Sequence, residues 1–161
     1  MRSYDATRPE GVSSPNDPIT TTFYIPNAAV TDLYEIESSR IALRRAKSPR
    51  VKAFAQLMIR DHERTAANLK NFVASNPVNI ALPKYLDARR AAMIQNLSKA
   101  SDAEFDAVYV GQQAAAHQEA MNLHKSFANR GDYPKLKSLA AAAAKLVEHH
   151  GSLIRALDRE I

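Results

Sequence analysis

The sequence contains no cysteine and no tryptophan, and only four of its 161 residues are glycine. Without cysteine the chain cannot form disulfides, use thiolate catalysis or bind a metal through thiolates, although either redox compartment remains compatible with it. No apolar run approaches the roughly 18 residues that a transmembrane helix needs. The N-terminus also lacks the basic-then-apolar pattern of a signal peptide. Histidine, carboxylate and amide side chains therefore remain as the candidate metal ligands.

The composition predicts an all-α protein of one domain. Hydrophobic residues make up 45% of the chain and charged residues 24%, which are globular values. Alanine is abundant and favours helices, because it loses no side-chain entropy on helix formation. No strand-like alternation of useful length is present. The net charge of +5 and the isoelectric point of about 9.6 permit acidic partners without requiring them.

The positions of proline, serine and aspartate predict the order of the helices. Residues 1–25 carry three prolines among small polar residues and are expected to form an extended or disordered N-terminal arm. Long helices are expected over residues 26–47, 49–75, 102–129 and 134–161, with a shorter one over 84–99. The short helix returns the chain along the bundle, so that the second and third long helices run parallel. One long crossover of this kind predicts a ferritin-like four-helix bundle in residues 26–161.

Each long helix places a polar side chain near its midpoint. His62 lies 13 residues after Pro49, His117 lies 15 after Asp102, and His150 lies 16 after Pro134, in helices of about 27 residues. Midpoints coincide in a bundle whichever way each helix runs. His62 and His150 lie within apolar stripes at helical spacing, and His117 borders such a stripe. The stripe expected around His150 is Leu139, Ala143, Leu146, Ile154 and Leu157.

Glu35, near the middle of the first helix, adds a carboxylate at the same height. Imidazole and carboxylate ligands suit zinc, iron, manganese, copper or nickel. The sequence therefore predicts one divalent transition metal ion bound by Glu35, His62, His117 and His150. Asp61 and Gln113 are expected to support these ligands or to replace one of them. Glu37 and Asp32 compete with Glu35 for its role, His149 is the alternative to His150, and His124 is expected to be exposed or secondary.

Several segments together resemble a known bacterial family. They are Glu35-Ile36-Glu37, Ile41 to Leu43, Phe54 to His62, Phe105-Asp106 followed by Tyr109, Gln113 and His117, and His149-His150. In order and spacing over about residues 23–157, they resemble the domain of unknown function 4142 family of the ferritin-like superfamily. The resemblance implies a ferritin-like bundle, usually in exported (periplasmic) bacterial proteins, without a settled activity. It also implies roles for Glu35, Asp61, His62, Gln113, His117 and His150.

The sequence departs from the family and the superfamily in different ways. Ser39 stands where the family commonly has glycine, and a Leu-Pro pair is missing near Lys145, but neither change affects a predicted ligand. Di-iron carboxylate bundles use two Glu-x-x-His pairs and two further glutamates. Here Ile59, Ala114 and Val147 stand three residues before the three histidines. This argues against ferroxidase or di-iron oxygenase activity, and the sequence assigns no enzymatic reaction.

The sequence is also compatible with two other functions. In the first, the chain is a metal-free helical interaction or stress-response protein, and the mid-height histidines form a buried hydrogen-bond network. In the second, the basic residues between Arg44 and Lys52 bind nucleic acid or anionic lipid weakly. No aromatic residues are interleaved there for base stacking, so no specific nucleic acid is expected. The sequence leaves open whether the chain forms a homo-oligomer and which protein partner it has.

Overall fold

The computed structural model describes residues 19–161 and confirms the all-α fold. An isolated bridge between Ile19 and Gly131 is the only β-type pairing in this part of the chain. Residues 1–18 of the predicted N-terminal arm lie outside the described residues. The five helices are α1 (Thr21–Arg45), α2 (Pro49–Ser75), α3 (Ala88–Lys99), α4 (Phe105–Arg130) and α5 (Pro134–Asp158).

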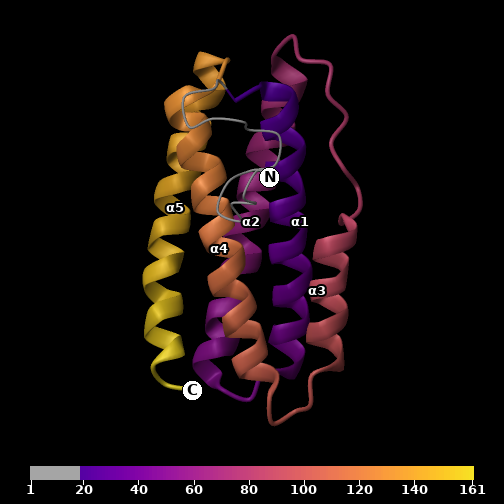
Figure 1. Cartoon of the computed structure of the whole chain (residues 1–161), viewed down its shortest axis with the longest axis vertical. Helices are drawn as coiled ribbons and strands as arrows, with labels where there is room; N and C mark the ends of the chain where they lie inside the picture. Colours follow the sequence, from indigo (N-terminus) through magenta and orange to yellow (C-terminus); the bar gives the residue numbers. More distant parts are fainter. Residues whose placement is uncertain (1–18) are drawn as a thin grey trace, which may run out of the picture.

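The four long helices form a bundle, and α3 lies outside it (Figure 1). The largest helix interfaces join α1 with α2 and α4 with α5, as expected for two antiparallel hairpins. The long segment after α2 carries the chain back along the bundle, so that α2 and α4 run in the same direction, as predicted. Helix α3 packs against α1 and α4, whereas the interface between α2 and α5 is small.

Helix α1 begins at Thr21, five residues before the predicted start at Pro26. Thr20 caps the helix by accepting a hydrogen bond from the backbone N–H of Phe23. Pro26 removes one helical hydrogen bond, but the preceding turn is held because Tyr24 and Ile25 are buried in the core. Residues 21–25, which were expected to belong to the arm, therefore form the first turn of α1.

Contacts with the α4–α5 turn fix this early start. The backbone N–H of Ile19 donates to the carbonyl of Arg130, and Asp132 returns a backbone hydrogen bond to Ile19. The Asp132 carboxylate accepts hydrogen bonds from both the N–H (2.9 Å) and the hydroxyl (2.6 Å) of Thr21. These contacts span more than 100 residues in sequence, so local sequence patterns do not indicate them.

Two other helix starts lie later than predicted. Helix α3 begins at Ala88 instead of residue 84, because Asp87 accepts the backbone hydrogen bond of Arg90 and caps the helix there. Helix α4 begins at Phe105 instead of residue 102. The Ser101 hydroxyl donates to the Glu104 carboxylate, so the predicted capping box does not form with the backbone.

Two apolar clusters occupy the two halves of the bundle and enclose a polar layer. One cluster contains Val51, Phe54, Met58, Phe105 and Tyr109 among others. The second cluster, toward the start of α1, includes Tyr24, Leu69, Phe72, Leu123 and Phe127. On α2, His62 falls between Met58 and Leu69, and the other helices place polar residues at the same height. The buried polar layer consists of Asp32, Glu35, Asp61, His62, Gln113, His117 and His150.

The buried face of helix α5 differs from the predicted one. Its fully buried residues before His150 are Leu136, Ala140, Ala144 and Val147. The predicted stripe residues Leu139, Ala143 and Leu146 are only half-buried. The reason is that α5 packs mainly on α4 and little on α2, so its buried face turns toward α4. Both stripes include His150, Ile154 and Leu157, so the prediction for the site histidine is unaffected.

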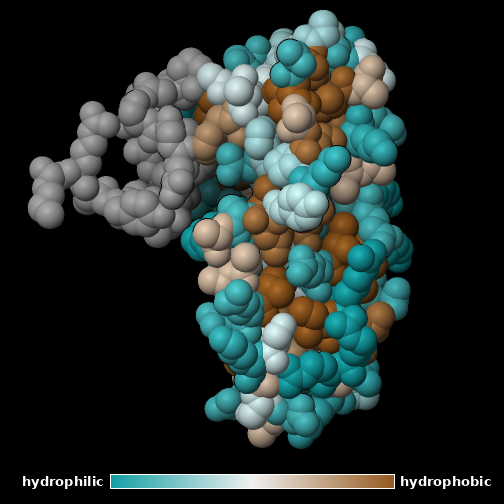
Figure 2. All heavy atoms as spheres, turned by 90° about the vertical axis from the view of Figure 1, so that its right-hand side faces the viewer, coloured by the Kyte–Doolittle hydropathy of each residue, from teal (hydrophilic) through white to brown (hydrophobic). Residues whose placement is uncertain are grey.

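The surface around α3 mixes charged and apolar side chains. Figure 2 shows hydrophobic side chains along the middle of this face, interrupted by hydrophilic ones. Arg45 holds the end of α3 there by donating to the carbonyls of Leu97, Ser98 and Ala100. This basic residue of the α1–α2 turn is therefore structural. None of the helices within residues 19–161 is long and apolar enough to cross a membrane.

Replacing Asp132 with alanine tests the anchoring of α1. The change removes the acceptor of two hydrogen bonds from Thr21, so we expect the free energy of unfolding to fall by about 1–2 kcal/mol. Urea denaturation measures this loss, and amide hydrogen exchange should rise in the first turn of α1. Asp158→Ala, at an exposed position near the end of α5, is the matched control. Equal effects of the two substitutions would contradict this account.

Candidate metal centre

Three histidines from three different helices converge in the polar layer. His62 comes from α2, His117 from α4 and His150 from α5. One ligand nitrogen from each lies within 4.8 Å of the other two, and all three side chains are buried. The ring centroids are 5.3–5.9 Å apart. Three imidazoles at these separations are placed to surround one ion.

Each of the three imidazoles uses one nitrogen to fix its orientation. His62 Nδ1 lies 2.8 Å from the Asp32 carboxylate, and His150 Nε2 lies 2.8 Å from the Asp61 carboxylate. His117 Nδ1 lies 2.9 Å from the backbone carbonyl of Gln113. A hydrogen bond from the outer nitrogen to a carboxylate or carbonyl is the usual support of a metal-binding histidine, because it fixes the tautomer and the ring plane.

The remaining nitrogens face one another across the layer. They are His62 Nε2, His117 Nε2 and His150 Nδ1, of which the last two approach to 3.3 Å. His62 Nε2 is buried and has no hydrogen-bond partner among the described residues. An unpaired buried polar atom costs about 1–3 kcal/mol. Coordination of a metal ion would satisfy this nitrogen, so the donor set fits an ion.

Glu35 lies beside the three histidines. Its side chain is buried, and neither carboxylate oxygen has a hydrogen-bond partner within the described part of the chain. One oxygen lies 3.5 Å from His117 Nδ1. This is a close electrostatic contact and not a hydrogen bond, because Nδ1 is already directed at the Gln113 carbonyl. Glu35 therefore approaches the outer side of His117 and does not belong to the group of three mutually close ligands.

The other predicted site residues fall into two groups. Asp61 and Gln113 belong to the buried layer, where Asp61 holds His150 and the Gln113 side chain donates to Ser38. Glu37 and His149 are exposed, and the structure does not bring them into the layer. The ring centroids of His149 and His150 are 6.4 Å apart.

Two residues have a larger role than the sequence indicated. Asp32 accepts hydrogen bonds from the hydroxyl of Thr65 and pairs with His62, so it does more than stabilise a helix N-terminus. It lies three residues before Glu35, on the same helical face, and this spacing is the signal that could have identified it. His124 is buried, not exposed as expected, and its Nδ1 lies 2.7 Å from the hydroxyl of Tyr24.

Burial and neighbouring charges shift the protonation of the layer. Burial, followed by the charges of His62 and His150, lowers the pKa of His117 to about 3. Burial also lowers the pKa of His150 to about 4, although the hydrogen bond to Asp61 opposes this shift. For His62, burial disfavours the charged form, but the hydrogen bond to Asp32 and the Glu35 charge outweigh it and raise the pKa. Burial raises the pKa of Glu35 to about 7.

Two of the three inner nitrogens are therefore free of protons at neutral pH. A metal ligand must be unprotonated at its donor atom, so neutral His117 and His150 are ready to coordinate an ion. His62 differs, because its hydrogen bond to Asp32 and the Glu35 charge raise its pKa and favour a proton on its ring. A bound cation would replace this proton among the same carboxylates.

The sequence matches the family described as Domain of unknown function (DUF4142) over residues 7–157. This range includes nearly the whole chain, and the protein belongs to this family. No match was found among curated proteins.

A solved structure described as "CopM in the Cu(II)-bound form" has a similar fold. The TM-score is 0.72, and the alignment covers 89% of this chain and 98% of that chain. The sequence identity is 19%, so the similarity establishes a shared fold and assigns no ligand by itself. The shared fold is consistent with the all-α helical bundle described above.

The lowered histidine pKa values predict that the metal-free protein loses stability in acid. Between pH 6.5 and about 4, unfolded histidines bind protons, whereas His117, His150 and His124 stay neutral in the folded protein. The unfolded state therefore binds more protons, and stability falls as the pH falls. Glu35 acts in the opposite direction, because it keeps its proton in the folded state up to pH 7. His62 does not add to the loss, because its pKa is raised in the folded protein.

The effect of the three histidines exceeds that of the one carboxylate. We therefore expect the free energy of unfolding to fall by about 2–3 kcal/mol for each pH unit below pH 6.5, down to about pH 4. Urea denaturation of chelator-treated protein at pH 7, 6 and 5 measures it. The variant His117→Gln removes one of the titrating groups and should show a smaller pH dependence. A stability that is constant between pH 7 and 5 would contradict the assigned protonation states.

Proposed function

We propose that this protein binds a single transition metal ion through His62, His117 and His150. The observation that carries the proposal is the arrangement of their nitrogens: the outer ones are fixed by protein acceptors, and the inner ones face a common point. A hydrogen-bonded core without metal would leave His62 Nε2 unpaired. That orphaned nitrogen favours metal binding over the metal-free interaction or stress protein.

Copper is the ion that we propose first. Among divalent first-row ions, Cu(II) binds nitrogen sites most tightly, and imidazole is a common ligand for it. The structure with a similar fold is described as Cu(II)-bound, which supports the same choice. Zinc, iron, manganese and nickel are the alternative ions, and their binding is to be measured alongside that of copper. An exported, periplasmic setting is proposed from the family resemblance alone.

Glu35 is proposed to balance the charge of the ion through His117. Its carboxylate faces the outer nitrogen of His117, not the point where the inner nitrogens meet. Asp32 and Asp61 hold the other two imidazoles through hydrogen bonds. Three carboxylates around three neutral imidazoles would compensate a divalent cation in a buried layer. No reaction is assigned, because the chain's own groups explain binding without one.

The pair His150→Ala and His149→Ala tests the metal site. The two histidines are neighbours in sequence, but His150 is buried in the layer and His149 is exposed. We expect wild type and His149→Ala to bind one equivalent of Cu(II), measured by elemental analysis after desalting. Thermal melts should show stabilisation by about 4 kcal/mol at an ion concentration of 1,000 times Kd. His150→Ala should show neither effect.

Electron paramagnetic resonance of the Cu(II) form should show coupling to three imidazole nitrogens, and two in His150→Ala if any copper remains. Identical metal uptake by both variants would remove the proposed site. A wild-type protein whose melting temperature does not respond to any of the five metals, with no metal after purification, would favour the metal-free alternative.

Glu35→Gln tests the role of the carboxylate. If Glu35 acts through His117, the three-nitrogen spectrum persists and the affinity falls about tenfold, which is the usual size of an effect on a supporting partner. The control is Glu37→Gln, on the exposed face of the same helix. A change in the coordination spectrum of Glu35→Gln would instead make Glu35 a ligand of the ion.

A further inference from the structure

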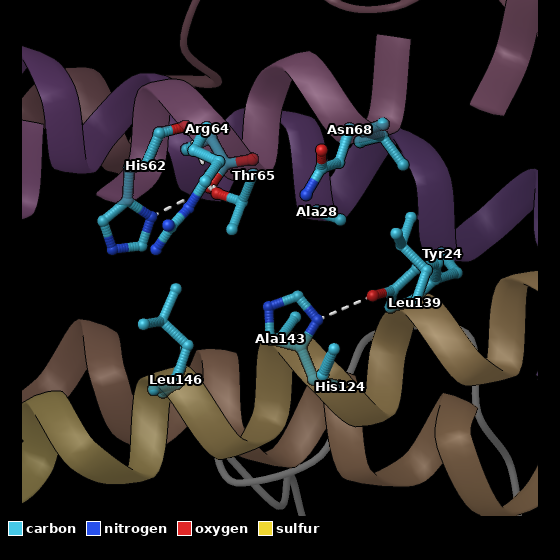
Figure 3. Close-up of a pocket in the computed structure, with 14 residues that line it drawn as sticks. Tyr24, Ala28, His62, Arg64, Thr65, Asn68, His124, Leu139, Ala143 and Leu146 are labelled. Carbon is cyan, nitrogen blue, oxygen red and sulfur yellow. Dashed lines mark hydrogen bonds and ion pairs between the residues drawn. The ribbon is translucent and has the colours of Figure 1, made fainter. Parts of the chain in front are cut away.

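A pocket of about 290 Å³ lies beside the histidine layer, where α2 and α5 make little contact. Figure 3 shows His62, Arg64, Thr65 and Asn68 on one side and Leu139, Ala143 and Leu146 on the other. The volume is about twice that of an engineered cavity that binds benzene, roughly 150 Å³. A molecule with about ten non-hydrogen atoms therefore fits.

The α5 wall of the pocket is apolar. It consists of Leu139, Ala142, Ala143, Leu146 and Val147. Leu139, Ala143 and Leu146 stay only half-buried there, because the buried face of α5 turns toward α4. Apolar walls with a few polar groups are typical of pockets for small organic ligands.

The α2 rim supplies hydrogen-bond donors. Arg64 and Asn68 are four residues apart, so their side chains lie on the same face of α2. The Arg64 side chain is 64% exposed and contacts Asp61 through one nitrogen at 3.4 Å. Its other guanidinium nitrogens can donate to a ligand. A guanidinium binds carboxylates strongly, and the Asn68 amide adds a second donor further along the same rim.

The acidic residue that lines the pocket already has hydrogen-bond partners. Asp32 contributes to the lining, but its Oδ1 interacts with both His62 and Thr65. The buried end of the pocket holds Tyr24 and His124, which pair with each other. Arg64 is therefore the charged side chain that remains for a ligand among those that line the pocket.

We propose that this pocket binds a small carboxylate with an apolar body, such as a medium-chain fatty acid. The carboxylate is held at the rim by Arg64 and Asn68, and the apolar body lies against the α5 wall. His62 forms part of the wall, but binding of the carboxylate does not require an ion in the histidine layer. The proposal therefore goes beyond the proposed metal function and is independent of it.

Titration of full-length, chelator-treated protein with octanoate tests the proposal. Methyl NMR should show shifts of Leu139, Ala143 and Leu146 that saturate at one equivalent. Octanol and octylamine have the same chain with a neutral or a positive head group. We expect octanoate to bind about tenfold more tightly than octanol, and octylamine to bind most weakly. Equal binding of all three, or preference for octylamine, would overturn the carboxylate assignment.

Two pairs of variants locate the binding. Arg64→Gln should weaken octanoate about tenfold and leave octanol unchanged, whereas Lys70→Gln, at an exposed position of the same helix, should change neither. Ala143→Phe fills the pocket and should abolish binding, and Ala141→Phe, on the exposed side of α5, should preserve it. Unchanged octanoate binding by Arg64→Gln and Ala143→Phe would disprove the proposal. If Ala143→Phe fails to fold, the comparison of Arg64→Gln with wild type and the methyl shifts of the wild-type protein still test whether octanoate binds in the pocket.

Discussion

Three imidazoles buried at one height of a helical bundle must find partners for six nitrogens without water. Asp32, Asp61 and the Gln113 carbonyl take the three outer nitrogens. Of the inner nitrogens, His117 Nε2 and His150 Nδ1 approach to 3.3 Å, and His62 Nε2 has no partner among the described residues. Unpaired buried polar atoms are costly, so this layer lowers the stability of the metal-free core. The same feature makes it suitable for a metal ion.

The surrounding structure holds the helices of the layer in register. Apolar clusters close the bundle on both sides of it, and neither cluster contains the polar residues of the layer. The chain entering α1 is tied to the α4–α5 turn by Ile19 and Thr21, which links the two hairpins at one end. Arg45 ties the end of α3 to α1 at the other end. These contacts fix the helices that carry the imidazoles.

The side chains of this layer differ from those of di-iron bundles. There, four glutamates and two histidines bind two bridged metal ions. Here, the carboxylates lie behind the imidazoles and orient them or balance charge, while nitrogen atoms occupy the centre. A nitrogen-rich centre favours one borderline ion such as Cu(II) or Zn(II) over a pair of bridged irons.

The sequence alone determined the helical class, the long crossover and the height of His62, His117 and His150. These follow from helical periodicity and from the positions of capping residues and prolines, which are local properties. The rotation of α5, the early start of α1 and the pairing of Asp32 with His62 depended on contacts between distant segments. Periodicity places a residue on a face but does not decide how far that face turns toward each neighbour. The tertiary structure therefore decided which carboxylate holds which imidazole, and it opened the pocket between α2 and α5.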